Sequence, residues 1–167
     1  MNTSPHHDRL PDPVEQEAFY RDVPTKRAIA WLVDVVITVV LTAITVPFTL
    51  FTALFYLPVL YMLVAIIYRA ASMAAGSATL GMRLTGIVVL DRNGERLDPI
   101  SAILHTLGYV VSMSMVIPQL ISIAMMLTSE KRQGLSDLVL GTVALNRAAE
   151  TFGAARADRV SGTTQRP

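Results

Sequence analysis

A long apolar segment between Pro24 and Pro47 constrains the fold of this chain more than any other feature. It opens with Lys26 and Arg27 and then runs apolar for about two dozen residues, the length that a helix needs to cross a bilayer. Asp34 is the only charged residue inside the apolar part. A carboxylate at that depth is costly unless it faces protein, water or a binding partner, so its role bears directly on function.

Two further apolar blocks, at 48–68 and 99–128, indicate an all-α membrane protein. Charged residues are 16% of the sequence, whereas soluble domains carry about a quarter, and the apolar blocks hold almost none of them. We predict helices at about 25–46, 48–70 and 99–127. They would form a helical transmembrane bundle of three or four hydrophobic segments in the lipid bilayer.

The basic residues predict the orientation of the chain. Lys26 and Arg27 precede the first block and Arg69 follows the second, while the connector near Pro47 carries no charge. Because basic flanks stay on the cytoplasmic side, we expect the N-terminus in the cytoplasm and this connector outside. The chain is therefore expected to be a multi-pass protein of the cell membrane.

The last apolar block, 99–128, leaves two arrangements open. As one helix it would be about 45 Å long, more than a bilayer core needs, and Pro118 offers a break. It forms either one tilted, kinked span or two short helices that turn back near Pro118. Basic residues after the block favour the second arrangement, because they prefer the cytoplasm.

A short cytoplasmic β-hairpin-like segment is expected between the second and third blocks. The sequence LTGIVVLD (84–91) is short and β-branched, and Asn93-Gly94 is typical of a tight hairpin turn. The sequence VLGTVALN (139–146) has the same pattern, and the two strands can pair only on one side of the membrane. This also favours the turned-back arrangement of the last block.

The two ends of the chain are polar and lack apolar periodicity. Residues 1–23 are rich in proline, histidine and acidic side chains, and residues 147–167 are small and polar. We predict that both are disordered, the first as a cytoplasmic tail.

The first and last blocks each collect their polar residues on one helix face. In the first block this face comprises Arg27, Trp31, Asp34, Thr38, Thr42 and Thr45. In the last block it comprises Ser101, His105, Gly108, Ser112, Met115, Gln119, Ser122 and Met126. We expect the faces to meet each other or a second copy, and packing is the simpler explanation for each hydroxyl taken singly.

Asp34 has a structural and a functional interpretation of equal weight. In the structural one it is held by a partner such as Arg83, His105 or a charge after the last block, because Arg27 lies about 10 Å away along the helix axis. In the functional one it is a cation or proton site, because a desolvated carboxylate can exchange a proton for a cation. For His105, a hydrogen-bonded interhelical role is favoured over a proton relay. On spacing alone, Asp137 is a turn or cap residue.

Other function classes find no support in the sequence. The chain has no cysteine, no cluster of side chains at metal-ligand spacing, no phosphate-binding loop and no nucleophile motif. Its basic residues form no patch that would suit a nucleic acid. We therefore expect no enzymatic activity, no metal and no cofactor.

Three separated motifs resemble the RDD family of small bacterial integral membrane proteins, which is named for one arginine and two aspartates. The motifs are KRAIAWLVDVVI, GSATLGMRLTGIVVLDRNGERLD and KRQGLSDLVLGTVAL, and together they cover about 24–146. The matching positions are Arg27, Asp34, Thr79, Gly81, Arg83, Gly86, Asp137, Gly141 and Thr142. Two positions depart from the family pattern, because Met82 stands where a lysine is usual and His105 where a basic residue is common.

The resemblance implies a membrane protein proposed to act in transport, with some relatives linked to cation/proton exchange. It implies that Arg27, Asp34 and Asp137 form one constellation, with Thr38, His105 and Arg83 as supporting polar residues. Two functions follow. The chain transports a cation, proton or small solute, or it is a non-transporting scaffold in which these charges are structural. In both we expect a homo-oligomer or a second membrane protein as partner.

Overall fold

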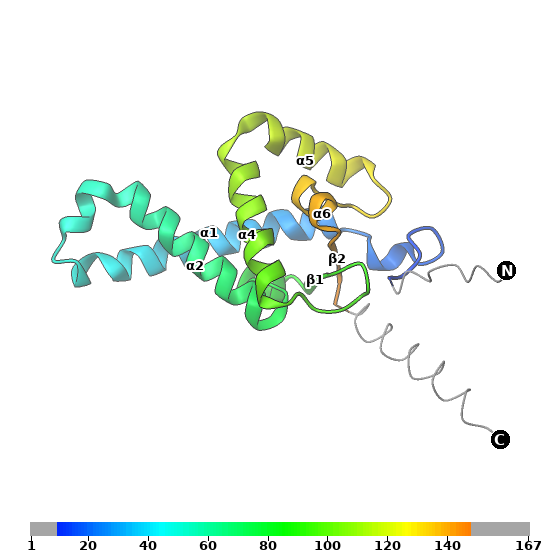
Figure 1. The fold of residues 1–167 in the computed structure, drawn as a ribbon, viewed down its shortest axis with the longest axis horizontal. Helices are drawn as coiled ribbons and strands as arrows, with labels where there is room; N and C mark the ends of the chain where they lie inside the picture. The colour runs from blue at the N-terminus through cyan, green and yellow to red at the C-terminus, as the bar shows by residue number, and fades with distance from the viewer. Residues whose placement is uncertain (1–9, 148–167) are drawn as a thin grey trace, which may run out of the picture.

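The computed structural model describes residues 10–147, which are mostly helical. The long helices are α1 (Val23–Phe48), α2 (Leu57–Gly76), α4 (Pro99–Ser114) and α5 (Val116–Thr128). The short elements are η1 (Glu17–Phe19), η2 (Thr52–Tyr56), α3 (Leu80–Leu84), α6 (Leu135–Leu140), β1 (Ile87–Leu90) and β2 (Val143–Asn146). Figure 1 shows the α1–α2 hairpin extending away from the small sheet, with α4 crossing it.

Helices α1 and α2 are, within residues 10–147, the two that are long and apolar enough to cross a membrane alone. The predicted start of the second helix at residue 48 is wrong. Leu50 and Phe51 adopt positive φ angles of 51° and 63°, which reverse the chain before η2. The helix α2 then begins at Leu57, and Pro58 sits in its first turn, where a missing N–H costs nothing. It also runs past Arg69 to Gly76, further than predicted.

Helices α4 and α5 form a pair bent by 114°, so the last apolar block is broken into two helices and is not one continuous helix. The break lies at Met115, whose backbone is extended, and not at Pro118. Pro118 falls in the first turn of α5, where its lack of an N–H removes no helical hydrogen bond. The pair is either one broken span or a re-entrant loop, so the described part of the chain, 10–147, has two or three candidate spans.

Strands β1 and β2 pair antiparallel, with Ile87 opposite Asn146 and Leu90 opposite Val143. The expectation that the two similar segments pair is therefore confirmed. The turn at Asn93-Gly94 is also present, but it brings only an isolated bridge, between Leu90 and Arg96. The main partner of β1 thus comes from the far end of the chain, not from its own hairpin.

The segment 10–22 packs on the sheet, so the predicted disorder over 1–23 is wrong for these residues. Leu10 and Tyr20 are buried in one cluster with side chains of both strands, and the Tyr20 hydroxyl donates to the Pro11 carbonyl at 2.7 Å. The Asn146 side chain donates to the carbonyls of Ala18 and Arg21 at 2.9 and 3.2 Å. The polar composition of this segment gave no sign that Leu10 and Tyr20 would be buried. Residues 1–9 and 148–167, which include most of the second predicted tail, lie outside the described residues.

The main buried core lies at the end of the long helices where they meet the sheet. Its residues come from α1, α2, α4, the α3 region and both strands. They are Val23, Ala30, Met73, Ala78, Met82, Ile87, Val89, Leu97, Ala102 and Ala144. The other end of the α1–α2 hairpin instead exposes large apolar side chains such as Val40, Ile44 and Phe55. This distribution suits helices that leave a packed base and enter lipid.

Candidate functional site

Asp137 is the centre of a buried polar cluster at the base of the helices. Arg27 Nη1 donates to its Oδ2 at 2.5 Å, and His105 Nε2 lies 2.9 Å from its Oδ1. The N–H of Gly134, just before α6, donates to Oδ2 at 3.0 Å, and the Thr142 hydroxyl lies 3.3 Å from Oδ1. Asp137 therefore joins α1, α4 and α6 to the start of β2.

The electrostatics of this cluster hold Asp137 in its charged form. Burial alone would raise the pKa of Asp137, but the charge of Arg27 and hydrogen bonds from His105 and Arg27 outweigh it. They hold the pKa of this carboxyl well below its usual range. At neutral pH the group is an anion, so His105 Nε2 carries the proton of their hydrogen bond. The carboxylate acts here as a fixed charge.

Asp34 is the centre of a second cluster, which ties α1 to α2 and to the start of α3. The Tyr68 hydroxyl donates to Oδ1 and the Thr79 hydroxyl to Oδ2, each at 2.6 Å. The N–H of Gly81 donates to Oδ1 at 2.9 Å. Thr79 also caps α3, because its hydroxyl accepts from the N–H of Met82 at 3.2 Å.

Gly81 permits the close approach on which this cluster depends. A Cβ at this position would meet the Ala30 carbonyl oxygen of α1 far inside contact distance and would lie 2.8 Å from Asp34 Oδ1. Both obstacles are rigid, since one is helix backbone and the other a side chain held by three hydrogen bonds. Glycine therefore lets the N–H of α3 reach the carboxylate.

Arg69 is a buried cation beside Asp34. Its Nη1 lies 4.0 Å from Asp34 Oδ2, and its guanidinium lies over the Tyr109 ring, 3.8 Å from the centroid. This is a cation–π contact between α2 and α4. Its Nε is buried and has no hydrogen-bond partner among residues 10–147. A buried guanidinium with unused donors is unusual and marks a binding site candidate.

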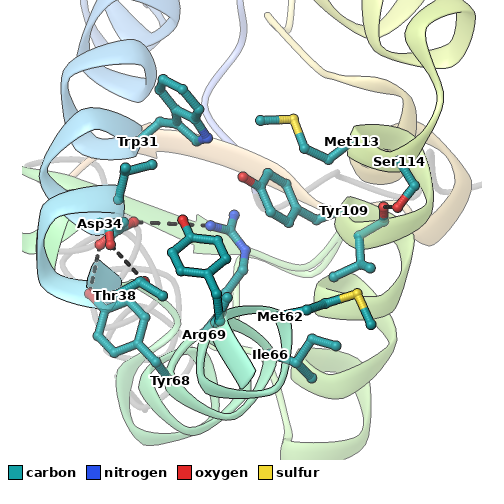
Figure 2. Close-up of a pocket in the computed structure, with 14 residues that line it drawn as sticks. Trp31, Asp34, Thr38, Met62, Ile66, Tyr68, Arg69, Tyr109, Met113 and Ser114 are labelled. Atoms are coloured by element: carbon teal, nitrogen blue, oxygen red, sulfur yellow. Dashed lines mark hydrogen bonds and ion pairs between the residues drawn. The ribbon is translucent and has the colours of Figure 1, made fainter. Parts of the chain in front are cut away.

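A cavity of about 290 Å³ lies beside Arg69, between α1, α2 and α4. Figure 2 shows the guanidinium in the cavity wall between Asp34 and Tyr109. Six of the fourteen lining residues are aromatic or methionine: Trp31, Tyr61, Met62, Tyr68, Tyr109 and Met113. The cavity therefore combines a largely apolar wall with two buried charged groups, Arg69 and Asp34, and a few convergent polar groups are usual in a small-molecule site.

The structure divides the predicted charge constellation between two clusters. Arg27 and Asp137 are together, whereas Asp34 is held by α2 and α3. The proposed partners of Asp34 were wrong, because His105 binds Asp137 and Arg83 donates to the carbonyls of Ala78 and Ser72, each at 3.3 Å. Arg83 lies in the last turn of α3, and its side chain reaches back to the end of α2.

The threonine hydroxyls of the first predicted polar face donate within their own helix. Thr38 lines the cavity, but its hydroxyl donates to the Asp34 carbonyl at 2.7 Å, and Thr42 repeats this with Thr38 at 2.8 Å. In the last block, Ser112 lies 3.2 Å from Gln119 across the bend. The bonds of Thr38 and Thr42 stay within α1, so they do not test the prediction that these hydroxyls pack against another helix. Among the described residues, no three side chains of metal-ligand type gather.

Sequence reasoning missed Arg69, Tyr68 and Tyr109 as site residues. Arg69 ends an apolar block, so it was interpreted as a flanking charge at the membrane surface. One signal argued otherwise, because the sequence AASMAAG after it continues the helix for nearly two turns. An arginine that far inside a helix is expected to face protein and not water.

Comparison with known proteins identifies the family. The model of the RDD family matches residues 22–141, which confirms the resemblance of the three motifs. No curated protein and no solved structure gave a match. The match spans most of the chain and includes the arginine and both aspartates of the two clusters. The chain therefore belongs to the RDD family of membrane proteins.

Proposed function

We propose that this protein binds a small solute in the cavity between α1, α2 and α4 and moves it across the cell membrane. One observation carries the proposal: Arg69 is buried in the cavity wall and leaves hydrogen-bond donors unused. Such donors are costly to bury unless a ligand completes them. Two of the helices that line the cavity, α1 and α2, are the candidate spans that could cross a membrane alone. The site would therefore lie within reach of the membrane interior.

In this proposal Arg27, Asp34 and Asp137 hold the helices together and do not bind the solute. Asp34 accepts hydrogen bonds from three donors, and a cation placed on it would have to displace them or compete with Arg69. Asp137 is held by Arg27 and His105 away from the cavity. A cation or proton carried by Asp34 is therefore the less favoured form of transport.

A complete pathway would need more than one copy. Two or three spans enclose little space, and the α1–α2 hairpin exposes large apolar side chains along much of its length. We propose a homo-oligomer in the cell membrane, with the N-terminus and the sheet on the cytoplasmic side, no metal or cofactor, and no enzymatic activity. The basic residues Lys26 and Arg27 at the start of α1 support this orientation.

The test is flux through purified protein in liposomes that contain a pH-sensitive dye. Gradients of sodium, potassium, lactate and glutamate are applied to wild type and to Ala65→Leu. Ala65 lines the cavity one turn before Arg69, so leucine fills the space without changing charge. We expect flux of at least one probe to be reduced at least tenfold in Ala65→Leu, with unchanged protein level and elution volume.

Absence of flux above empty liposomes for every probe would support the second function instead, a membrane scaffold. A specific observation favours that alternative: both aspartates are fully engaged by partners within the fold. As a scaffold, the protein would tolerate Ala65→Leu without any phenotype in cells. It would lose oligomer formation or partner binding when either cluster is broken.

A further inference from the structure

We propose that the cavity takes an amphiphilic anion, a single carboxylate or phosphate group on an apolar chain, that enters from the bilayer. This inference rests on the proposed function, because it names the class of solute for the same cavity. Two independent features carry it. One is the unused donor of the Arg69 guanidinium, and the other is the apolar opening of the cavity toward the outside of the helices.

Arg69 lines the cavity, and its guanidinium has an unused donor. Its Nη1 lies 4.0 Å from Asp34 Oδ2, whereas Nε, which shares the other edge with Nη2, is buried and has no hydrogen-bond partner within residues 10–147. Two parallel N–H groups match a carboxylate or phosphate in a bidentate arrangement. Arg69 is 9% exposed, so water does not readily replace such a ligand. The guanidinium of Arg69 lies over the Tyr109 ring, which holds its orientation.

Asp34 also lines the cavity, but its carboxylate already has partners. Its two oxygens are engaged by the hydroxyls of Tyr68 and Thr79 and by the N–H of Gly81, which stabilise its negative charge. It also lies on the Nη1 side of the guanidinium, away from Nε. An anion at Nε and Nη2 is therefore attracted by the nearer charge, whereas a cationic amphiphile would be repelled by Arg69.

The opening of the cavity fits the chain of an amphiphile. Trp31, Met62 and Met113 line it and are each partly exposed, at 39%, 48% and 37%. They lie on α1, α2 and α4, and because α1 and α2 are candidate spans, the opening would face lipid once these helices cross the membrane. Its volume of about 290 Å³ suits a head group and the first carbons of a chain, with the remainder extending into the bilayer.

Trp31 provides a direct measurement, because it is the one tryptophan of the chain and it lines the cavity. The full-length protein is purified in an uncharged detergent and titrated with 12-bromododecanoate, whose bromine quenches a nearby indole. We expect saturable quenching that dodecanoate and dodecyl phosphate displace. Preference between those two competitors distinguishes a fatty-acid source from a phospholipid source.

The same titration contains the outcomes that would overturn the proposal. Equal quenching by 12-bromododecanol would mean that the cavity recognises only the apolar chain. Displacement by inorganic phosphate as strong as by dodecyl phosphate would mean a site for a free anion. Stronger displacement by dodecyltrimethylammonium than by dodecanoate would reverse the sign of charge that we assign to the ligand.

Substitutions of Arg69 test whether the quenching of Trp31 depends on this side chain. We expect Arg69→Gln to weaken binding of 12-bromododecanoate at least tenfold and Arg69→Lys to have an intermediate effect, because lysine keeps the charge but loses the fork. Arg21→Gln is the matched control, since this arginine is exposed and distant from the cavity. If Arg69→Gln does not fold, Ala65→Leu must weaken the quenching instead, and unchanged quenching there rejects the site.

Failure of this inference can be told apart from failure of the proposed function. If 12-bromododecanoate does not bind but Ala65→Leu still blocks flux of lactate or glutamate, the ligand class is wrong and the transport site stands. If 12-bromododecanoate binds but no probe, including dodecanoate, crosses the membrane, the ligand class stands and transport is wrong.

Discussion

Arg27 Nη1 lies 2.5 Å from Asp137 Oδ2, although the two residues are 110 positions apart in the sequence. The pair joins the first turns of α1 to α6 and so holds the beginning and the end of the described chain together. Two of the three residues in the predicted charge constellation thus form one ion pair. The third, Asp34, has a different cation beside it, Arg69 on α2.

Removing the charge of Asp137 should destabilise the protein strongly. In Asp137→Asn, Arg27 would stay buried without its counter-ion, which typically costs about 3 kcal/mol or more. The double variant Arg27→Gln/Asp137→Asn should lose less stability than the sum of the two single variants, because no buried charge is left alone. The measurement is denaturant unfolding in detergent micelles.

Asp22→Asn serves as the control for this cycle, since Asp22 is an exposed aspartate just before α1. We expect it to change stability by less than about 0.5 kcal/mol. Strictly additive effects of the Arg27 and Asp137 substitutions would contradict the direct coupling.

The pH dependence of stability should follow from the lowered pKa of Asp137. A group whose folded pKa lies below its unfolded value, about 3.9 for Asp, stabilises the fold above that value and loses this effect as pH falls through the folded pKa. The stability advantage of wild type over Asp137→Asn should therefore persist down to about pH 5 and shrink below about pH 4. Thermal unfolding between pH 8 and pH 3 measures it. An advantage that vanishes between pH 7 and pH 6 would mean that this carboxylate takes up a proton near neutrality.

The helices were predictable wherever the apolar blocks alone determined them, and the boundaries failed where proline was interpreted as a break. Pro47, which divided the first two predicted helices, lies inside the last turn of α1, and Pro118 lies in the first turn of α5, where proline is tolerated. The pairing of β1 with β2 was predictable because both segments have the same short β-branched pattern. The packing of 10–22 was not, because it depends on Leu10 and Tyr20 finding a sheet that forms elsewhere.

The members of the site were predictable in part, but their grouping was not. Helical periodicity correctly places Arg27 and Asp34 on α1, yet it cannot say which element covers each turn. The start of α3 covers Asp34 and α6 covers Arg27, and these short helices are too small to show a periodic pattern. Arg69 was missed because a charge that follows an apolar run looks the same at a membrane surface and in a buried helix.

The close contact of α3 with α1 predicts a sharp difference between two glycines. Gly81→Ala should destabilise the protein by about 2 kcal/mol or more, because the new methyl group collides with backbone of α1 and displaces the N–H that binds Asp34. Gly108→Ala is the matched control within α4. Its Cβ would lie 3.4 Å from the Ser136 side chain, an almost ordinary contact, and alanine favours the helix. Equal stability of the two variants would show that α3 can move away from α1 at little cost.

The last prediction separates a framework role of Asp34 from an exchange role. In Asp34→Asn the amide can still accept from Tyr68 and Gly81 and can donate to Thr79, but Arg69 loses the charge beside it. We expect a loss of about 1–3 kcal/mol in stability and a reduced protein level. Asp34→Leu, which leaves three donors without an acceptor, should be worse.

Flux per folded molecule is the deciding measurement for Asp34. If this carboxylate only holds α1, α2 and α3 together, Asp34→Asn protein that is recovered folded should carry any flux that wild type carries, within about twofold by the usual reading of kinetic differences. Arg69→Gln should abolish it, because Arg69 is the cavity's unsatisfied donor. The opposite result, a normally folded Asp34→Asn protein without flux beside an active Arg69→Gln protein, would identify Asp34 as the exchange site and Arg69 as its structural counter-ion.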